Sequence, residues 1–219
     1  MERQIVVKGV GTATTSPDQV NVSLSVSSRK RDYEETLNEN ATLIEALNQS
    51  LEQIGFDKKA VKTTNFTVQT EYDQSRDRNG NFQRVFVGYR CTHQLKITFD
   101  FSNEKLGKTL AAISQSIADP ELSIRFTIKD PSDIKKDLLR SAADNAREKA
   151  ELLCEASNVK LGKLLSIDYD WNEINLYSRT GFEMEDRCLT MAPKAIANME
   201  IEPDDINVSD TVTFVWEIQ

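Results

Sequence analysis

The apolar residues of this chain follow two different periods, and this constrains its fold more than any other feature. From residue 20 to 26 every second residue is apolar, and the residues between them are Asn or Ser. Such alternation is typical of a β-strand with one buried face. Apolar residues then recur every three or four positions, which predicts a long amphipathic helix with one buried stripe. The stripe consists of Tyr33, Leu37, Ala41, Ile44, Leu47, Leu51 and Ile54.

This first helix carries signals for its start and its end. Asp32, followed three residues later by Glu35, is typical of the capping pair at a helix N-terminus. Gly55 stands directly after the last apolar position, where a glycine commonly terminates a helix.

Two long strands are predicted next, from about residue 61 to 72 and from about 82 to 101. Between them lies a polar segment, residues 73–81, that contains Asn79-Gly80, a standard hairpin signal. Strands of this length suggest a hairpin arm that projects beyond the sheet. Such arms often reach a neighbouring subunit, and their exposed edges are liable to pair with another chain.

The middle of the chain predicts two further helices with a strand between them. The shorter helix is expected to be capped by Ser102 and ended by Asp119-Pro120. Its stripe is Leu106, Leu110, Ile113 and Ile117, and the strand after it carries Leu122, Ile124, Phe126 and Ile128. Asp130 as cap and Pro131 at the first helical position then open the third helix.

The stripe of the third helix is rich in alanine, so this helix can lie close to whatever it packs against. The stripe consists of Ile134, Leu138, Ala142, Ala146, Ala150 and Leu153. A strand from about 163 to 175 follows, then a stretch without regular period at 176–203, which is predicted to be a long loop. The last strand carries Val208, Val212, Phe214, Trp216 and Ile218.

Together these elements predict an α+β fold with antiparallel sheets packed against a few long amphipathic helices, because strands and helices do not alternate regularly. The pattern is compatible with two intimately associated lobes. No linker-like stretch separates them, so residues 1–219 are predicted to form a single domain.

The charge of the chain excludes some classes of partner. Its formal net charge is −8, which disfavours binding to nucleic acid and to anionic lipid surfaces. The dense basic run at 29–31 is followed at once by acidic residues and is interpreted as a solvated junction between a strand and a helix.

Cysteine content and hydropathy bear on the compartment. Cys91, Cys154 and Cys188 are an odd and sparse set, so the fold is not expected to depend on disulfides, although one bridge plus one free thiol stays open. The first residues show no signal-peptide pattern, and no apolar stretch is long enough to span a bilayer, so no membrane insertion is expected. The cytoplasm is slightly favoured; an extracytoplasmic location is the alternative if an export signal precedes these residues.

Candidate chemistry is sparse. The only histidine, His93, stands two residues after Cys91 on a predicted strand, so the two side chains would share a face. Such a pair could serve as nucleophile and base or as two metal ligands, but nothing at a recognisable spacing supplies the remaining groups. The structural interpretation is therefore favoured.

Glycines and carboxylates give no stronger signal. Gly9-x-Gly11 is followed by a strand and not by the helix that a phosphate-binding loop needs, so these glycines are expected to permit a β-bulge or a close strand crossing. The acidic residues at 183–186 and 200–205 lack the spacing of a calcium loop. No catalytic, cofactor-binding or metal-binding residue is predicted.

Several segments in order resemble the SIMPL family. They are Val7–Thr12, Pro17-Asp18 with the strand that follows, Leu51–Gly55, Lys62-Thr63 with Phe66 and Val68, Gly88-Tyr89, and the alanine-spaced helix that closes on Leu161-Gly162. The resemblance implies a family that includes YggE-like bacterial proteins and a periplasmic immunogenic protein that assembles into a large channel-like oligomer. It implies no enzymatic activity and no site residues.

Three hypotheses follow for function. The first is a non-enzymatic protein that self-assembles or binds a protein partner, with an envelope-related or stress-related role. The second is an enzyme or small-ligand-binding protein with a pocket near Cys91 and His93 or beneath residues 176–203. The third, a signalling adaptor, rests on the resemblance alone.

Overall fold

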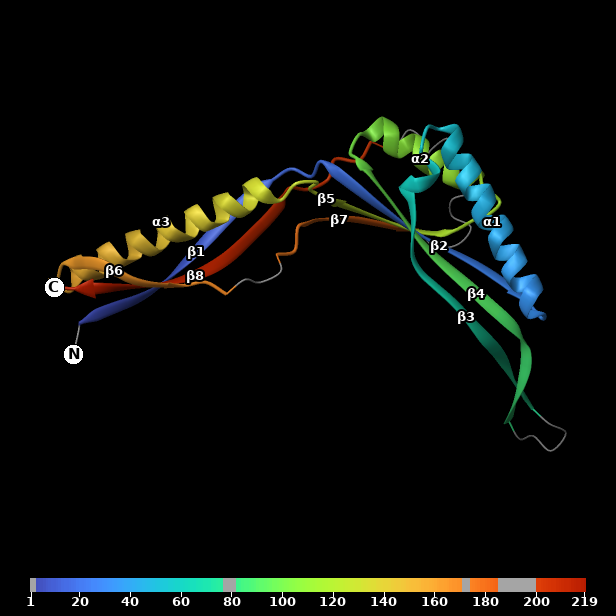
Figure 1. Ribbon diagram of the computed structural model, residues 1–219, viewed down its shortest axis with the longest axis horizontal. Helices are drawn as coiled ribbons and strands as arrows, with labels where there is room; N and C mark the ends of the chain where they lie inside the picture. The colour runs from blue at the N-terminus through green and yellow to red at the C-terminus, as the bar shows by residue number, and fades with distance from the viewer. Residues whose placement is uncertain (1–2, 77–81, 171–173, 185–199) are drawn as a thin grey trace. The chain divides into compact units, whose positions relative to one another are not determined.

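The computed structural model describes residues 3–76, 82–170, 174–184 and 200–219 (Figure 1). The chain folds into two compact units, each built from more than one segment. The terminal unit contains residues 1–18, 127–179 and 203–219, and the central unit contains residues 19–126 and 180–202. Helices and antiparallel strand pairs occur in both units, which confirms the predicted α+β class.

The central unit is built on a five-stranded sheet in the order β3-β4-β2-β5-β7. Its strands are β2 (Gln19–Lys30), β3 (Val61–Arg76), β4 (Phe82–Asp100), β5 (Glu121–Thr127) and β7 (Tyr177–Met184). β4 pairs antiparallel with both β2 and β3. The predicted alternation of β2 is confirmed, since Val20, Val22, Leu24 and Val26 are all buried.

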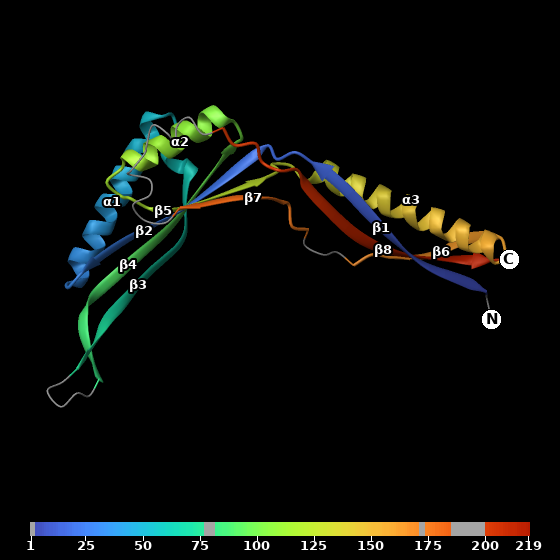
Figure 2. The same ribbon diagram turned by 180° about the vertical axis from the view of Figure 1, so that it is seen from behind.

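Two helices, α1 (Tyr33–Gln53) and α2 (Asn103–Gln115), bury one face of this sheet (Figure 2). The predicted caps are confirmed: Asp32 accepts hydrogen bonds from the backbone N–H groups of Glu34 and Glu35, and Ser102 accepts one from Lys105. Gly55 has a φ of 97° after α1, as expected for a glycine that ends a helix. The core residues include Leu47, Leu51, Leu106, Leu110, Ile113, Ile124 and Phe126.

The second helix is shorter than predicted. It ends at Gln115, where Ser116 turns to an extended conformation with ψ 141°. Ile117 therefore lies outside the helix and is 70% exposed, so its assignment to the buried stripe was wrong. The strand that follows also ends one residue early, at Thr127. A short 3₁₀-helix, Lys58–Ala60, connects α1 to β3.

The terminal unit contains a three-stranded sheet in the order β1-β8-β6, covered on one face by α3 (Ser132–Ala156). Its strands are β1 (Gln4–Thr15), β8 (Ile206–Ile218) and β6 (Leu161–Asp168). Phe214 and Trp216 of β8 stack on each other and pack against the alanines of α3.

α3 differs from the prediction in its N-terminal cap and in the last residue of its buried stripe. Pro131 is the N-cap residue and not the first helical residue, while Asp130 accepts a hydrogen bond from the backbone N–H of Ser132 at 2.9 Å. At the other end Cys154 is buried and Leu153 is half exposed. A strict four-residue step of buried positions therefore continues to the end of the helix.

Gly9 and Gly11 place β1 in close contact with α3. A Cβ atom on Gly9 would lie 2.0 Å from the carbonyl oxygen of Ala142, and one on Gly11 would lie 2.1 Å from that of Leu138. The pairing of β1 with β8 is continuous from Gln4 to Thr15, so the expectation of a bulge or a strand crossing was wrong. The close neighbour is a helix, and the alanines on that helix provide the space.

The last third of the chain contains a strand that was predicted to be loop. β6 ends at Asp168, short of residue 175, and Tyr177–Met184 forms β7 at the edge of the central sheet. Cys188, Glu185, Asp186 and the Asn79-Gly80 turn lie outside the described residues. Cys91 and Cys154 are free thiols, and among the described helices none is long and apolar enough to cross a membrane.

Candidate functional site

Cys91 and His93 share one face of β4, as predicted. Their contacts, however, are those of residues that pack the sheet and not those of a reactive pair. Cys91 is fully buried at the end of the core, opposite Ser28 of β2. The Nε2 atom of His93 lies 2.8 Å from the hydroxyl of Thr63, and its ring meets that of Phe66 edge to face at 5.2 Å. The imidazole is therefore engaged with β3 and not with the thiol.

Burial acts against thiolate chemistry at Cys91 and keeps His93 neutral to lower pH. It raises the pKa of the Cys91 thiol, an effect that a hydrogen bond with Ser28 partly offsets. Burial also lowers the pKa of His93 below its ordinary value. A protonated thiol is a poor nucleophile and a poor metal ligand. Within the described ranges, no three His, Cys, Asp or Glu side chains are placed to hold a metal ion.

The lowered pKa of His93 has a consequence for stability. An unfolded chain takes up this proton near pH 6.5, whereas the folded protein takes it up only at lower pH. The unfolded state therefore binds more protons below pH 6.5, and the folded state loses stability as the pH falls. We expect His93→Gln to lose less of its urea midpoint than the natural protein between pH 7.5 and 5.5. Parallel losses in the two proteins would contradict this expectation.

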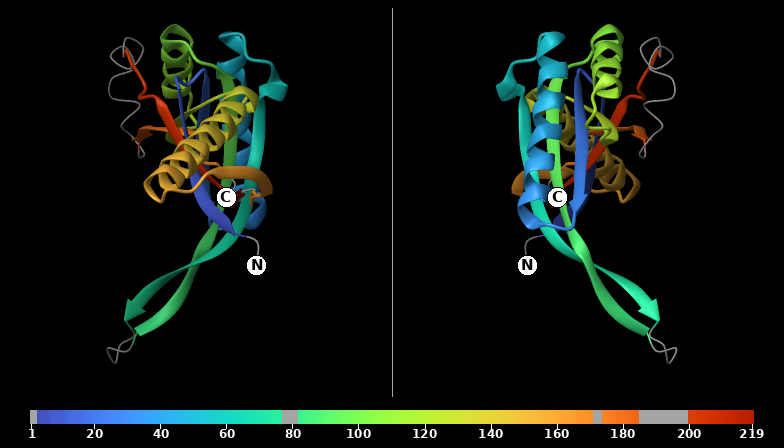
Figure 3. Two further views of the ribbon diagram at one scale, coloured as in Figure 1. Left: turned by 90° about the vertical axis from the view of Figure 1, so that its left-hand side faces the viewer. Right: turned by 90° about the vertical axis from the view of Figure 1, so that its right-hand side faces the viewer.

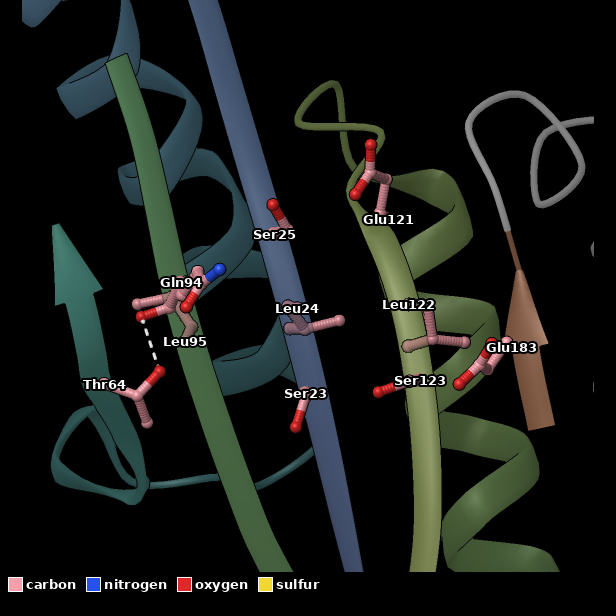
Figure 4. Close-up of a pocket in the computed structure, with 10 residues that line it drawn as sticks. All are labelled: Ser23, Leu24, Ser25, Thr64, Gln94, Leu95, Glu121, Leu122, Ser123 and Glu183. Atoms are coloured by element: carbon pink, nitrogen blue, oxygen red, sulfur yellow. Dashed lines mark hydrogen bonds between the residues drawn. The ribbon is translucent and has the colours of Figure 1, made fainter. Parts of the chain in front are cut away.

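A polar depression lies on the sheet face of the central unit opposite the helices (Figure 4). Its volume is about 370 Å³, and every strand of the five-stranded sheet contributes to it. It is lined by Ser23, Leu24, Ser25, Thr64, Gln94, Leu95, Glu121, Leu122, Ser123 and Glu183. The small serines of β2 leave the hollow at the middle of the sheet, and the Thr64 hydroxyl donates to the carbonyl oxygen of Gln94 at 3.3 Å.

The chemistry of the depression differs from that of the predicted candidates. Of the ten residues that line it, two are glutamates and none is Lys or Arg, so it favours neutral or cationic groups over anions. Glu183 belongs to residues 176–203, the segment beneath which the sequence analysis allowed for a pocket. Cys91 and His93 are not among the lining residues.

A second candidate is the arm formed by the far ends of β3 and β4. β2 ends at Lys30, opposite Tyr89, so the β4 residues from Phe82 to Gly88 pair with β3 alone among the described strands. Figure 3 shows the two strands continuing as a ribbon beyond the end of β2. The predicted projecting hairpin arm is thus present.

Aromatic side chains form a row along this arm. Tyr33 at the start of α1 meets Tyr89 edge to face at 5.4 Å, Tyr89 meets Phe86 at 5.3 Å, and Phe86 meets Tyr72 at 5.8 Å. The guanidinium of Arg84 lies 4.8 Å from the centre of the Tyr72 ring. We call Tyr33, Tyr72, Phe86 and Tyr89 the aromatic row. Tyr33 and Tyr72 are about half exposed, and Phe82 near the end of the arm is 68% exposed.

The base of the arm is fixed by charges and by a glycine. Arg29 and Arg90 stand opposite each other on β2 and β4, and both form ion pairs with Glu71 of β3. The register of β3 against β4 shifts between Glu71 and Tyr72, next to Gly88 with its φ of 152°. A Cβ on Gly88 would lie 2.3 Å from the carbonyl oxygen of Lys30. The arm therefore leaves the sheet at a defined bulge.

Comparison with known proteins identifies the family of this chain. The family model described as SIMPL, protein of unknown function (DUF541), matches residues 5–216. The chain belongs to the SIMPL family. Two relatives are the 26 kDa periplasmic immunogenic proteins of Brucella melitensis biotype 1 and Brucella abortus strain S19, each 24% identical over 165 residues. The match covers 75% of this chain, and it spans 65% of the length of each relative.

Neither candidate site of this SIMPL chain was foreseen as a set of residues. The arm was predicted from strand length, but the aromatic row was missed, although aromatic residues on both sides of a hairpin turn are a readable signal. The depression had no such signal. Its seven polar residues lie on five strands, and each one alone is an ordinary residue of a solvent-facing strand.

Proposed function

We propose that this protein is a non-enzymatic, self-assembling protein and that the β3–β4 arm makes the contact between copies. The observation that carries the proposal is the aromatic row, whose members Tyr72 and Phe86 lie on the two-stranded part of the arm. A two-stranded ribbon is marginally stable in water without further packing, so this one gains from a partner that covers its apolar face.

The residues of the arm also suit protein recognition. Tyr, Phe and Arg are enriched at protein interfaces, and the aromatic rings bury large areas at low entropic cost. The edge-to-face contacts hold the rings in one arrangement before any partner binds. The ion pairs of Glu71 with Arg29 and Arg90 hold the base of the arm in the same way.

An envelope-related role is supported by the relatives, which are described as periplasmic proteins. Assembly through an arm suits an architectural protein of that setting, because its function then requires no reactive group. The same proposal covers binding of another protein through the same aromatic surface.

Native mass tests the proposal. Light scattering on a sizing column, across a range of concentrations, should give a mass above the 24.8 kDa of one chain. The double variant Tyr72→Ser, Phe86→Ser should dissociate at concentrations at least about tenfold higher than those at which the natural protein dissociates, because central aromatic residues contribute over about 1 kcal/mol each. Deleting residues 74–81 should have the same effect and leave the monomer folded.

A matched control separates the arm from general surface hydrophobicity. Leu152 of α3 is 66% exposed, so Leu152→Ser removes a similar apolar side chain away from the arm. This variant should assemble like the natural protein. A monomer at every concentration would overturn self-assembly, and an unchanged oligomer in the arm variants would remove the arm from it.

A further inference from the structure

Side chains of α3 occupy the middle of the outer edge of β1, at residues 8 to 12 of a strand that runs from Gln4 to Thr15. β1 is the first strand in the order β1-β8-β6, so every second residue turns its backbone groups away from β8. The backbone N–H of Thr12 donates to the Ser141 hydroxyl at 3.1 Å, and that of Val10 donates to Oδ1 of Asn145 at 3.0 Å. Nζ of Lys149 donates to the carbonyl oxygen of Lys8 at 3.2 Å.

The three contacts form a regular ladder. Ser141, Asn145 and Lys149 are four residues apart, and they meet strand residues 12, 10 and 8. Four helical residues rise about 6.0 Å, and two strand residues span about 6.7 Å. The two repeats therefore stay in step over three rungs, with helix and strand running in opposite directions.

The close approach of helix and strand makes these short side chains sufficient. Gly9 and Gly11 alternate with the ladder positions and face α3 without a Cβ atom. The helix backbone can then come near enough to β1 for a serine hydroxyl and an asparagine amide to reach its edge.

The opposite edge of the same sheet is strand β6, and its pairing with β8 is irregular. β6 shifts register against β8 twice, between Leu161 and Leu164 and between Leu164 and Ser166. Leu164 and Ile167 are about half exposed on this strand, which would otherwise suit pairing with a further strand. Bulges interrupt the regular spacing of backbone groups that an added strand needs.

We propose that both edges of the terminal sheet, as its described strands form it, are guarded against strand addition, β1 over residues 8–12 by the Ser141–Asn145–Lys149 ladder and β6 by its two bulges. The ladder takes the place of a fourth strand and keeps the β1 edge of one copy from pairing with that of a second copy. Association between copies is thereby directed away from this sheet. This inference rests on the ladder geometry and is independent of the arm.

Hydrogen exchange tests the rungs one at a time. Asn145→Ala should speed exchange of the Val10 amide at least tenfold and leave the Thr12 amide unchanged, and Ser141→Ala should do the reverse. Alanine preserves the helix, so these effects report the lost acceptor. Unchanged exchange at both amides would overturn the ladder as the source of protection.

Native mass tests the consequence for association. The triple variant Ser141→Ala, Asn145→Ala, Lys149→Ala is made in the Tyr72→Ser, Phe86→Ser background, so that association through the arm does not mask the result. It should form dimers or larger species at concentrations where its background stays smaller. The control Arg140→Ala, Asp144→Ala, Glu148→Ala has the same spacing on exposed positions of α3 and should not. A triple variant that exchanges fast at Val10 and Thr12 but keeps the mass of its background would overturn the proposed guarding role.

Discussion

Replacing Gly9 or Gly11 with valine should prevent the terminal unit from folding, and replacement with alanine should cost it about 3 kcal/mol or more of unfolding free energy. Overpacking of a tight core typically costs about 1–3 kcal/mol, and the higher end applies where backbone is struck. Here the added Cβ atoms would lie 2.0 Å and 2.1 Å from the carbonyl oxygens of Ala142 and Leu138. Helix and strand would have to separate, and the contacts of the alanine stripe would be lost with them.

Urea unfolding followed by tryptophan fluorescence measures this effect, because Trp216 is buried in the same unit. Gly181→Ala in β7 is the control, since a Cβ there would approach nothing closer than 3.9 Å. It should be neutral or slightly stabilising, as expected when a glycine in a strand gains a side chain. Equal stability of the Gly9, Gly11 and Gly181 variants would mean that α3 does not lie against β1 as described.

The second large effect is expected in the central unit, where Phe126→Ala should cost about 3–5 kcal/mol. Phe126 is fully buried in β5, and its ring meets that of Phe101 edge to face at 5.3 Å. Truncation removes the transfer free energy of the ring and leaves a cavity among neighbours that come from both helices and the sheet. Urea denaturation followed by circular dichroism would measure the loss.

Phe66 provides the matched control for this change. It is also a strand phenylalanine with one edge-to-face neighbour, His93, but half of its surface is exposed. Phe66→Ala should therefore cost about 1 kcal/mol or less, because little area leaves water when the native ring packs. A comparable loss in both variants would show that burial does not determine the contribution of these rings.

Local structure followed from the sequence wherever residues within one element act together. The alternation of Val20 to Val26 placed one face of β2 in the core, and the Asp32 and Ser102 caps fixed where two helices begin. Each of these signals joins residues two to four positions apart, so the order of the chain alone reveals them. The arm was predictable because its two strands and the turn between them are consecutive in the chain and unusually long.

The predictions were wrong where the structure of an element depends on the neighbour it packs or pairs with. Leu153 and Cys154 are both close to the α3 stripe, and only the packing of α3 in the folded unit decides that Cys154 is the buried one. Residues 177–184 lack a regular period, and they are a strand because β5 offers them an edge. A strand of mixed composition is defined by its partner more than by its own residues.

The sequence by itself determined most of the elements, the buried face of most of these and the close packing that an alanine stripe permits. Only the tertiary structure decided that this stripe meets Gly9 and Gly11, that Ser141 and Asn145 reach the edge of β1, and that seven polar residues from five strands share one depression. The residues in the α3 contacts with β1 are more than a hundred positions apart in the chain. Periodicity reports which face of an element is apolar, but the partner of that face is set by topology, because the hydrophobic effect has no direction and favours burial against any complementary surface.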